Sequence, residues 1–199
     1  MLYFISDTHF YHENILKLNP DFRFPFFEEV ILENLEKTLK PGDILYHLGD
    51  FTWHLDDRRG ILRRWKALPC RKVLVRGNHD SRFSDRDLGE FFDEIEEFSL
   101  VVEHSGVRLL LSHYPALDLR TGRFPDLQLE VERTFTDEGC DLLIHGHVHR
   151  GRDGRACGCC LKGIPCFNVN VEYSDFRPVS LQDILDRSLK GRPLLYPPS

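Results

Sequence analysis

The stretch LLIHGHVHR, residues 142–150, places three apolar residues directly before three histidines that alternate with a glycine and a valine. A short apolar run bounded by turn residues is typical of a buried β-strand. Histidine binds metal ions and carries protons near neutral pH, so its repetition at the end of such a strand indicates a chemical site. The fold is therefore predicted from the strands that share this arrangement.

Similar apolar runs recur along the chain. They cover residues 2–5, 44–48, 72–75, 107–111 and 167–171. Helical periodicity predicts helices over residues 28–39, 57–68, 91–98 and 180–191. Residues 98–113 have the pattern of a hairpin that turns at Ser105-Gly106. Together these segments predict an α/β protein with a mixed sheet.

Polar residues that can bind metals or move protons follow five of these runs. They are Asp7 and His9, Asp50, Asn78 with His79 and Asp80, His113, and the pair His147 and His149. In open α/β sheets, ligands bind outside the carboxyl ends of the strands, so we expect the five loops to converge on one site. At ordinary residue usage, GNHD would occur by chance on the order of once in a thousand such chains.

Length and composition set limits on the class of protein. The chain has 199 residues, and we expect one domain that spans residues 1–199. No stretch approaches the roughly 18 apolar residues of a membrane span, and the first apolar run, residues 2–5, is too short for a signal peptide, so we expect a cytoplasmic protein. The net charge of −6 disfavours an extended nucleic acid as the partner.

The series DTH (7–9), GD (49–50), GNHD (77–80), a separate His113 and GHVH (146–149) resembles the calcineurin-like metallophosphoesterases. It is most similar to their small, stand-alone bacterial and phage members. The resemblance implies a four-layer αββα sandwich of two mixed β-sheets flanked by helices. The protein phosphatases of this superfamily carry GDxxDRG, whereas this chain reads GDFTWHL from Gly49, which counts against that activity.

The resemblance also implies a binuclear metal centre. Its first ion would be held by Asp7, His9, Asp50 and His149, and its second by Asp50, Asn78, His113 and His147. Nitrogen and oxygen ligands suit divalent transition metals, with Mn²⁺ expected first and Fe, Zn²⁺ or Ni²⁺ as alternatives. Paired ions can activate a bridging hydroxide and clamp an in-line displacement at phosphorus.

The expected function is therefore hydrolysis of a phosphomonoester or phosphodiester by attack of a metal-bridged hydroxide. The substrate would be a small phosphate ester, with nucleotides as one class. His79 would protonate the leaving oxygen, and Asp80 would either orient the His79 ring or cap the next helix. A metal-dependent nuclease or cyclic nucleotide phosphodiesterase is an alternative. An inactive binding scaffold is a further alternative, although every ligand position is filled.

For the remaining histidines, arginines and aromatic residues, the sequence indicates a functional role less strongly. His12 and His54 either line the pocket or lie at the surface, His47 fits the core, His145 is expected just behind the ligands, and His104 needs no function. Arg76, Arg150 and Arg152 either grip phosphate or are solvated. The aromatic segment 22–27 either stacks a base or packs over the core.

Four cysteines lie between residues 157 and 166. Cys157 and Cys160 form a CxxC pair, Cys159 lies between them, and Cys166 offers a third ligand to the pair. A structural zinc site usually needs four donors, so a hairpin loop rich in small residues remains the alternative interpretation.

Overall fold

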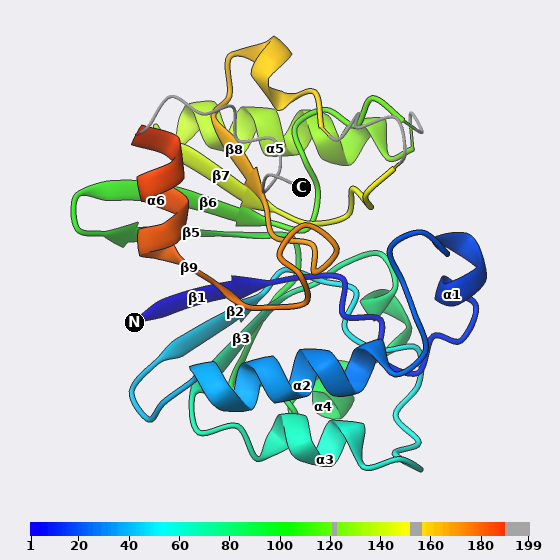
Figure 1. Cartoon of the computed structure of the whole chain (residues 1–199). Coiled ribbons are helices and arrows are strands. Elements are labelled where there is room, and N and C mark those ends of the chain that lie inside the picture. The colour runs from blue at the N-terminus through cyan, green and yellow to red at the C-terminus, as the bar shows by residue number, and fades with distance from the viewer. Residues whose placement is uncertain (121–122, 152–156, 190–199) are drawn as a thin grey trace.

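The computed structural model describes residues 1–120, 123–151 and 157–189, and these form two facing β-sheets (Figure 1). The first sheet has the strand order β4-β3-β2-β1-β9, and the second has the order β5-β6-β7-β8. The strands of the first sheet are β1 (Leu2–Ile5), β2 (Ile44–His47), β3 (Arg71–Val75), β4 (Glu94–Glu96) and β9 (Val179–Ser180). Those of the second are β5 (Ser99–His104), β6 (Val107–Ser112), β7 (Leu142–His145) and β8 (Cys166–Asn168).

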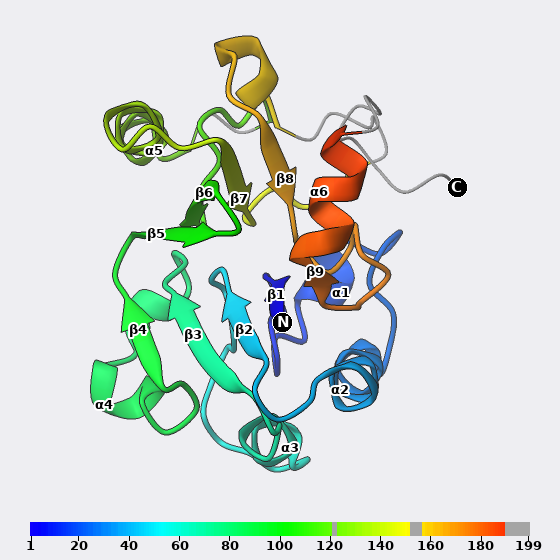
Figure 2. The same ribbon diagram turned by 90° about the vertical axis from the view of Figure 1, so that its left-hand side faces the viewer.

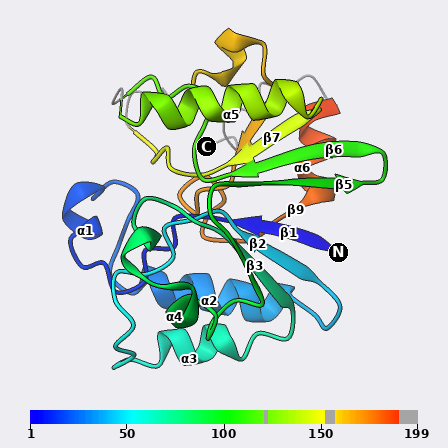
Figure 3. The same cartoon turned by 180° about the vertical axis from the view of Figure 1, so that it is seen from behind.

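Helices cover the outer faces of both sheets (Figure 2). Helices α2 (Phe27–Thr38) and α3 (Ile61–Lys66) cover the first sheet, and α5 (Pro125–Asp137) covers the second, as the view from behind also shows (Figure 3). Helix α6 (Leu181–Leu189) packs beside β9 and β1, and α1 (Ile15–Leu18) and α4 (Asp85–Leu88) are single turns. This is the predicted αββα arrangement. No helix in the described ranges is long and apolar enough to cross a membrane.

The alternation of side chains along β1 explains why the sheets stack. Leu2 and Phe4 belong to the apolar cluster between the two sheets, whereas Ile5 joins the cluster beneath α2 and α3. Successive residues of a strand point to opposite faces, so a strand that is apolar throughout can be covered on both sides. The fully buried Trp65 of α3 belongs to the same outer cluster as Ile5.

The structure confirms the predicted hairpin and corrects the prediction of three helices. Residues 98–113 form the predicted hairpin, and Ser105 and Gly106 have φ of 53° and 78°, as a tight turn requires. The helix predicted over 91–98 is wrong, because Glu94–Glu96 forms edge strand β4, paired in parallel with β3. The helix predicted over 57–68 covers only Ile61–Lys66. Helix α5 was not predicted, although Pro125 at its start and apolar residues four apart were present.

The strand directions place the functional loops at one edge. Strands β1, β2 and β3 run parallel to one another in the first sheet, and β6, β7 and β8 do so in the second. The loops that follow these strands therefore meet where the carboxyl ends of both sheets come together.

Candidate metal centre

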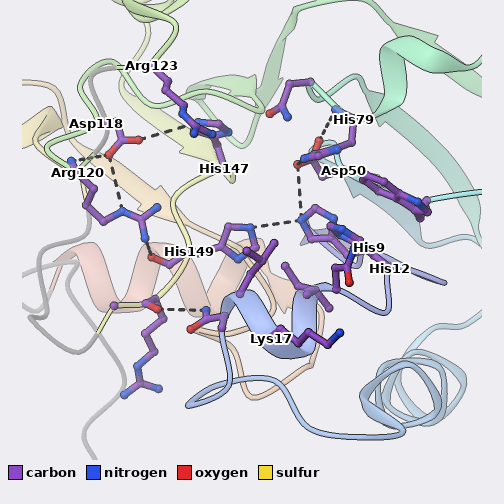
Figure 4. A pocket seen from close by; sticks show the side chains of 18 of the residues that line it. His9, His12, Lys17, Asp50, His79, Asp118, Arg120, Arg123, His147 and His149 are labelled. Carbon is purple, nitrogen blue, oxygen red and sulfur yellow. Dashed lines mark hydrogen bonds and ion pairs between the residues drawn. The ribbon is translucent and has the colours of Figure 1, made fainter.

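The five strand-end loops converge as expected, and their ligand atoms form two adjoining groups. Figure 4 shows His9, Asp50, His147 and His149 where they line the pocket. Asp7 and His9 follow β1, Asp50 follows β2, and Asn78 follows β3. His113 directly follows β6, and His147 and His149 follow β7. Asp7 and His149, which are far apart in the sequence, thus lie next to each other.

The first group surrounds the imidazole of His9. Its Nε2 lies 3.6 Å from Oδ2 of Asp50, 4.0 Å from Oδ1 of Asp7 and 3.3 Å from Nε2 of His149. The Nε2 of His149 lies 3.8 Å from the same Asp7 oxygen. Four donor atoms from three loops therefore face one small space.

The second group surrounds the imidazole of His113. Its Nε2 lies 3.6 Å from Oδ1 of Asp50, 3.2 Å from Oδ1 of Asn78 and 3.1 Å from Nδ1 of His147. Asp50 therefore contributes one oxygen to each group. Its carboxylate therefore lies between the two groups, next to that of Asp7.

Hydrogen bonds orient two of the imidazoles toward the site. The Nδ1 of His113 contacts the Leu48 carbonyl at 2.8 Å, and the Nδ1 of His149 contacts Oε1 of Glu172 at 2.8 Å. An acceptor at Nδ1 keeps the proton there, which leaves the Nε2 lone pair directed at the site. This is the tautomer that a metal ligand requires.

The donor set fits divalent cations. Oδ1 of Asp7 is buried and accepts no hydrogen bond among the described residues, which is costly for a carboxylate oxygen. Burial lowers the pKa of His147 to about 2 and, with His149 next, lowers that of His9 well below the ordinary range, so both rings are neutral. Neutral imidazoles and carboxylate oxygens suit ions such as Mn²⁺, Fe and Zn²⁺.

Asp50 lies in a site that disfavours its negative charge. Burial raises the pKa of its carboxyl to about 7, and the charges of Asp7 and Asp80 add to the increase. A nearby cation favours the charged form of a carboxylate. Divalent ions in the two groups would therefore offset the cost of burying Asp50 as an anion.

The backbone at the site is held in an unusual conformation. The φ angles of Asp7, His9, Asp50 and His147 are 56°, 47°, 59° and 64°, in the left-handed region that non-glycine residues rarely adopt. Such conformations cost roughly 1–3 kcal/mol each and cluster at functional sites. Four of the seven predicted ligands carry this strain.

Two glycines allow the ligand loops to approach one another. A Cβ on Gly77 would lie 2.4 Å from Oδ1 of Asp50, and one on Gly146 would lie 2.4 Å from Oγ of Ser6. Both distances are far below van der Waals contact. The glycines of GNHD and GHVH are thus required by the crowding around the carboxylates.

His79 lies at the side of the pocket, next to the first group. Its Nε2 is 3.8 Å from Oδ2 of Asp50, and its Nδ1 contacts the guanidinium of Arg82 at 3.2 Å. Burial, followed by the charge of Arg82, lowers the pKa of His79. The ring stays partly accessible, so it can meet a bound ligand.

The predicted roles of Asp80 are wrong. Its carboxylate is fully buried and accepts hydrogen bonds from the backbone N–H groups of Asp50, Phe51 and Gly77 at 2.8–3.0 Å. It therefore does not orient the His79 ring. It lies inside the 3₁₀ turn Asp80–Arg82 rather than before it, so it is not the cap either. Asp80 fixes the loop that carries Asp50.

Glu172 and Arg23 were missed in the sequence. Both side chains are fully buried and are paired at 2.7 Å, and Arg23 also donates to the carbonyl of Asp7 at 2.6 Å. Although burial alone would raise it, His149 and Arg23 hold the pKa of Glu172 well below its usual range. The signal for Glu172 was available, because it closely follows the run 167–171 as the other acidic groups follow theirs.

The cavity beside the ligands has a volume of about 860 Å³. Cations and rings line it, with His12, Lys17, Trp53, Arg120, Arg123 and Arg150 among them. The ring of His12 stacks on Trp53 with centroids 4.0 Å apart. His12 and Arg150 thus take the pocket positions that were predicted as one alternative for each.

Other predicted residues lie elsewhere. Arg76 is buried against the carbonyls of Asp80 and Phe83 and does not reach the cavity, and Arg152 lies outside the described residues.

The remaining histidines lie away from the cavity. His54 stacks on Tyr11. His47 packs in the core, as predicted, and contacts Thr8. His104 is exposed in the hairpin. His145 is not behind the ligands but faces three cysteines.

The aromatic segment 22–27 packs over the core only in part. Phe27 is buried in the core, whereas Phe24 and Phe26 are exposed. Phe22 is half-buried beneath the guanidinium of Arg150, whose carbon lies 4.7 Å from the ring centroid. None of these rings lines the cavity.

The chain matches one family of known proteins and is similar to two proteins of other organisms. The family model of calcineurin-like phosphoesterases matches residues 1–151. The crystal structure of a protein of unknown function from Aquifex aeolicus is 57% identical, covers 94% of this chain and 98% of its own, and superposes with a TM-score of 0.89. An uncharacterized protein of Methanocaldococcus jannaschii is 27% identical over 96% of this chain and 93% of its own length.

Proposed function

The chain belongs to the calcineurin-like phosphoesterases, and we propose that its site is a binuclear centre that hydrolyses a small phosphate ester. Membership makes the protein a metal-dependent hydrolase of phosphoester bonds. The number of ions, the residues that hold them and the class of substrate are the parts that we infer.

The position of Asp50 carries the proposal. Its Oδ2 lies 3.6 Å from His9 and its Oδ1 lies 3.6 Å from His113, so each oxygen faces a different group of ligands. We assign Asp7, His9, Asp50 and His149 to one ion and Asp50, Asn78, His113 and His147 to the other. We propose Mn²⁺ for both because the donors are oxygen and imidazole nitrogen, without thiolate.

Paired divalent ions supply Lewis acidity toward a phosphoryl oxygen and lower the pKa of water. The protein contributes binding and proton transfer. Arg120, Arg123 and Arg150 line the cavity and can contact the phosphate oxygens through their N–H groups. His79 reaches the same space through Nε2, the atom from which a proton would pass to the departing oxygen.

The shape of the cavity favours a small substrate. Its volume of about 860 Å³ lies within the range of pockets that enclose a single organic molecule. Trp53 and His12 form a stacked aromatic wall next to His79, with the Trp53 and His79 rings 5.5 Å apart. A flat organic group on the ester, including a nucleobase, can pack on such a wall.

A parallel assay tests the proposal. Purified protein is treated with a chelator, loaded with Mn²⁺ and offered bis(p-nitrophenyl) phosphate, p-nitrophenyl phosphate and cyclic nucleotides. We expect metal-dependent hydrolysis of at least one. We expect Asp50→Asn to lower turnover more than any other ligand substitution, because both groups lose an anionic oxygen.

A matched variant controls for nonspecific effects. Asp56 is exposed and pairs with Arg58 at the surface, so Asp56→Asn should retain the activity of the unmodified protein. Manganese content measured for the same samples should approach two ions per chain in the unmodified protein. Turnover of Asp50→Asn near that of the control would refute the bridging assignment.

A further inference from the structure

A second group of metal-ligand atoms lies on the far side of β7. Cys157, Cys159 and Cys166 place their Sγ atoms, and His145 a ring nitrogen, all within 4.8 Å of one another. All four residues are buried. The group contains three sulfur donors, whereas the candidate centre described above contains none.

The alternation along β7 separates this group from the candidate centre. Ile144 points into the cluster between the sheets, whereas Leu143 points into the cluster beneath α5 that also contains the three cysteines. His145 lies on the same face of the strand as Leu143. His147, two residues on, has already turned into the loop with a left-handed φ of 64°.

The imidazole of His145 is arranged as a ligand. Its Nδ1 contacts the carbonyl of Gly146 at 2.9 Å, so the proton lies there and the Nε2 lone pair is available. That Nε2 is buried, makes no hydrogen bond of regular geometry among the described residues and interacts with the thiol of Cys157. Leaving a ring nitrogen in this state is costly unless another group uses its lone pair.

The sulfur atoms of the cysteines are also close enough together to bind one metal ion. The Sγ atoms of Cys157 and Cys166 are 3.1 Å apart, and the backbone N–H of Ala116 donates to Sγ of Cys159 at 3.2 Å. In a tetrahedral zinc site with bonds of about 2.3 Å, ligand sulfurs are about 3.8 Å apart. The Cys157–Cys166 spacing is shorter than that value and all four ligand atoms lie within 4.8 Å of one another, so small side-chain rotations complete the tetrahedron.

From this geometry we propose that Cys157, Cys159, Cys166 and His145 form a structural zinc site. Three thiolates and one imidazole fill all four tetrahedral positions, which leaves no open position for water or substrate. The site is therefore structural rather than catalytic. Its ligands differ from the CxxC pair of the sequence, because Cys160 is exposed at the surface and Cys159 takes its place.

The ion would connect three separate segments. Cys166 begins β8, His145 ends β7, and Cys159 begins the 3₁₀ turn Cys159–Lys162. Cys157 also forms an isolated bridge with Asp118, whose carboxylate lies 4.0 Å from Nε2 of His147. The proposed zinc thus supports the loop that brings Asp118 to the rim of the cavity.

Cobalt substitution tests the site without relying on catalysis. The full-length protein, reduced and freed of metal, is titrated with Co²⁺ and then with Zn²⁺. We expect an intense sulfur-to-cobalt charge-transfer absorption that saturates near one equivalent and disappears as Zn²⁺ replaces Co²⁺. The catalytic ligands cannot give this absorption because they include no sulfur.

Variants assign the absorption to its ligands. Cys157→Ser and Cys166→Ser should each lose it, and Cys160→Ser, the matched exposed cysteine, should retain it. If the buried variants fail to fold, X-ray absorption at the zinc edge is measured instead on the unmodified protein loaded first with Mn²⁺ and then with one equivalent of Zn²⁺, and we expect about three sulfur neighbours at about 2.3 Å. Absence of the charge-transfer band from the reduced protein would overturn the proposal. An intramolecular Cys157–Cys166 disulfide in protein purified anaerobically from cells would do so as well.

Discussion

Replacing Glu172 by Gln is the sharpest test of how the candidate metal centre is held. The Glu172 carboxylate is fully buried and accepts hydrogen bonds from Nε of Arg23, Nδ2 of Asn19 and the N–H of Arg150, at 2.7–2.9 Å, while it also contacts Nδ1 of His149. The amide has nearly the same shape but no charge. Arg23 would then be a buried cation without its anion.

The expected losses of stability and metal affinity in Glu172→Gln follow from these contacts. Removing one partner of a buried ion pair destabilises a protein by about 3–5 kcal/mol, and we expect a loss near the lower end because the Gln oxygen still accepts one hydrogen bond. Loss of the carboxylate behind a ligating histidine weakens metal binding by about 10–100-fold. The substitution should therefore lower both the free energy of unfolding and the affinity for Mn²⁺.

Two assays separate these effects. Urea unfolding of the metal-free protein measures the first, and Mn²⁺ titration followed by hydrolysis of bis(p-nitrophenyl) phosphate measures the second. Glu33→Gln is the control, because Glu33 is exposed and pairs with Lys37 four residues on, at the surface. A Glu172→Gln protein that unfolds like this control and binds Mn²⁺ equally well would show that Glu172 does not support His149.

Three further changes probe the same loops. Gly77→Ala would place a Cβ 2.4 Å from Oδ1 of Asp50, so the Asp50 carboxylate must move, and kcat/KM should fall by about 100-fold while circular dichroism stays unchanged. His79→Asn should lower kcat by about 10²–10⁴-fold with metal content intact; loss of metal would instead identify His79 as a ligand. Asp80→Asn removes acceptors from buried N–H groups, including that of Phe51, and should cost about 1–3 kcal/mol in urea unfolding. Unfolding like that of the unmodified protein would contradict the role of Asp80.

The sequence was most informative where strands end. Residues at the carboxyl ends of parallel strands lie together, so the proximity of Asp7 and Asp50 was predicted from the strand ends, whereas the approach of His147 also depends on how the second sheet packs on the first. The orientations of the imidazole rings could not be predicted from the strand ends. They depend on acceptors such as the Leu48 carbonyl and Glu172, which come from other loops.

Residues that act through the backbone were the hardest to predict. Asp80 lies within GNHD and suggested a partner for His79, yet it binds three N–H groups whose position only the folded loops define. The strand β4 was mistaken for a helix because Phe91, Ile95 and Phe98 also recur at helical spacing. Pairing with β3 decided between the two periods.

The left-handed backbone of Asp7, His9, Asp50 and His147 also sets a limit on engineering this protein. Glycine at any of these positions would relieve torsional strain and, in the metal-free chain, favour folding. Each such replacement would delete a donor atom. A library screened for heat resistance alone would therefore drift toward glycine here and lose turnover, so thermostable enzymes are better sought by repacking α6 or the outer surface of α5.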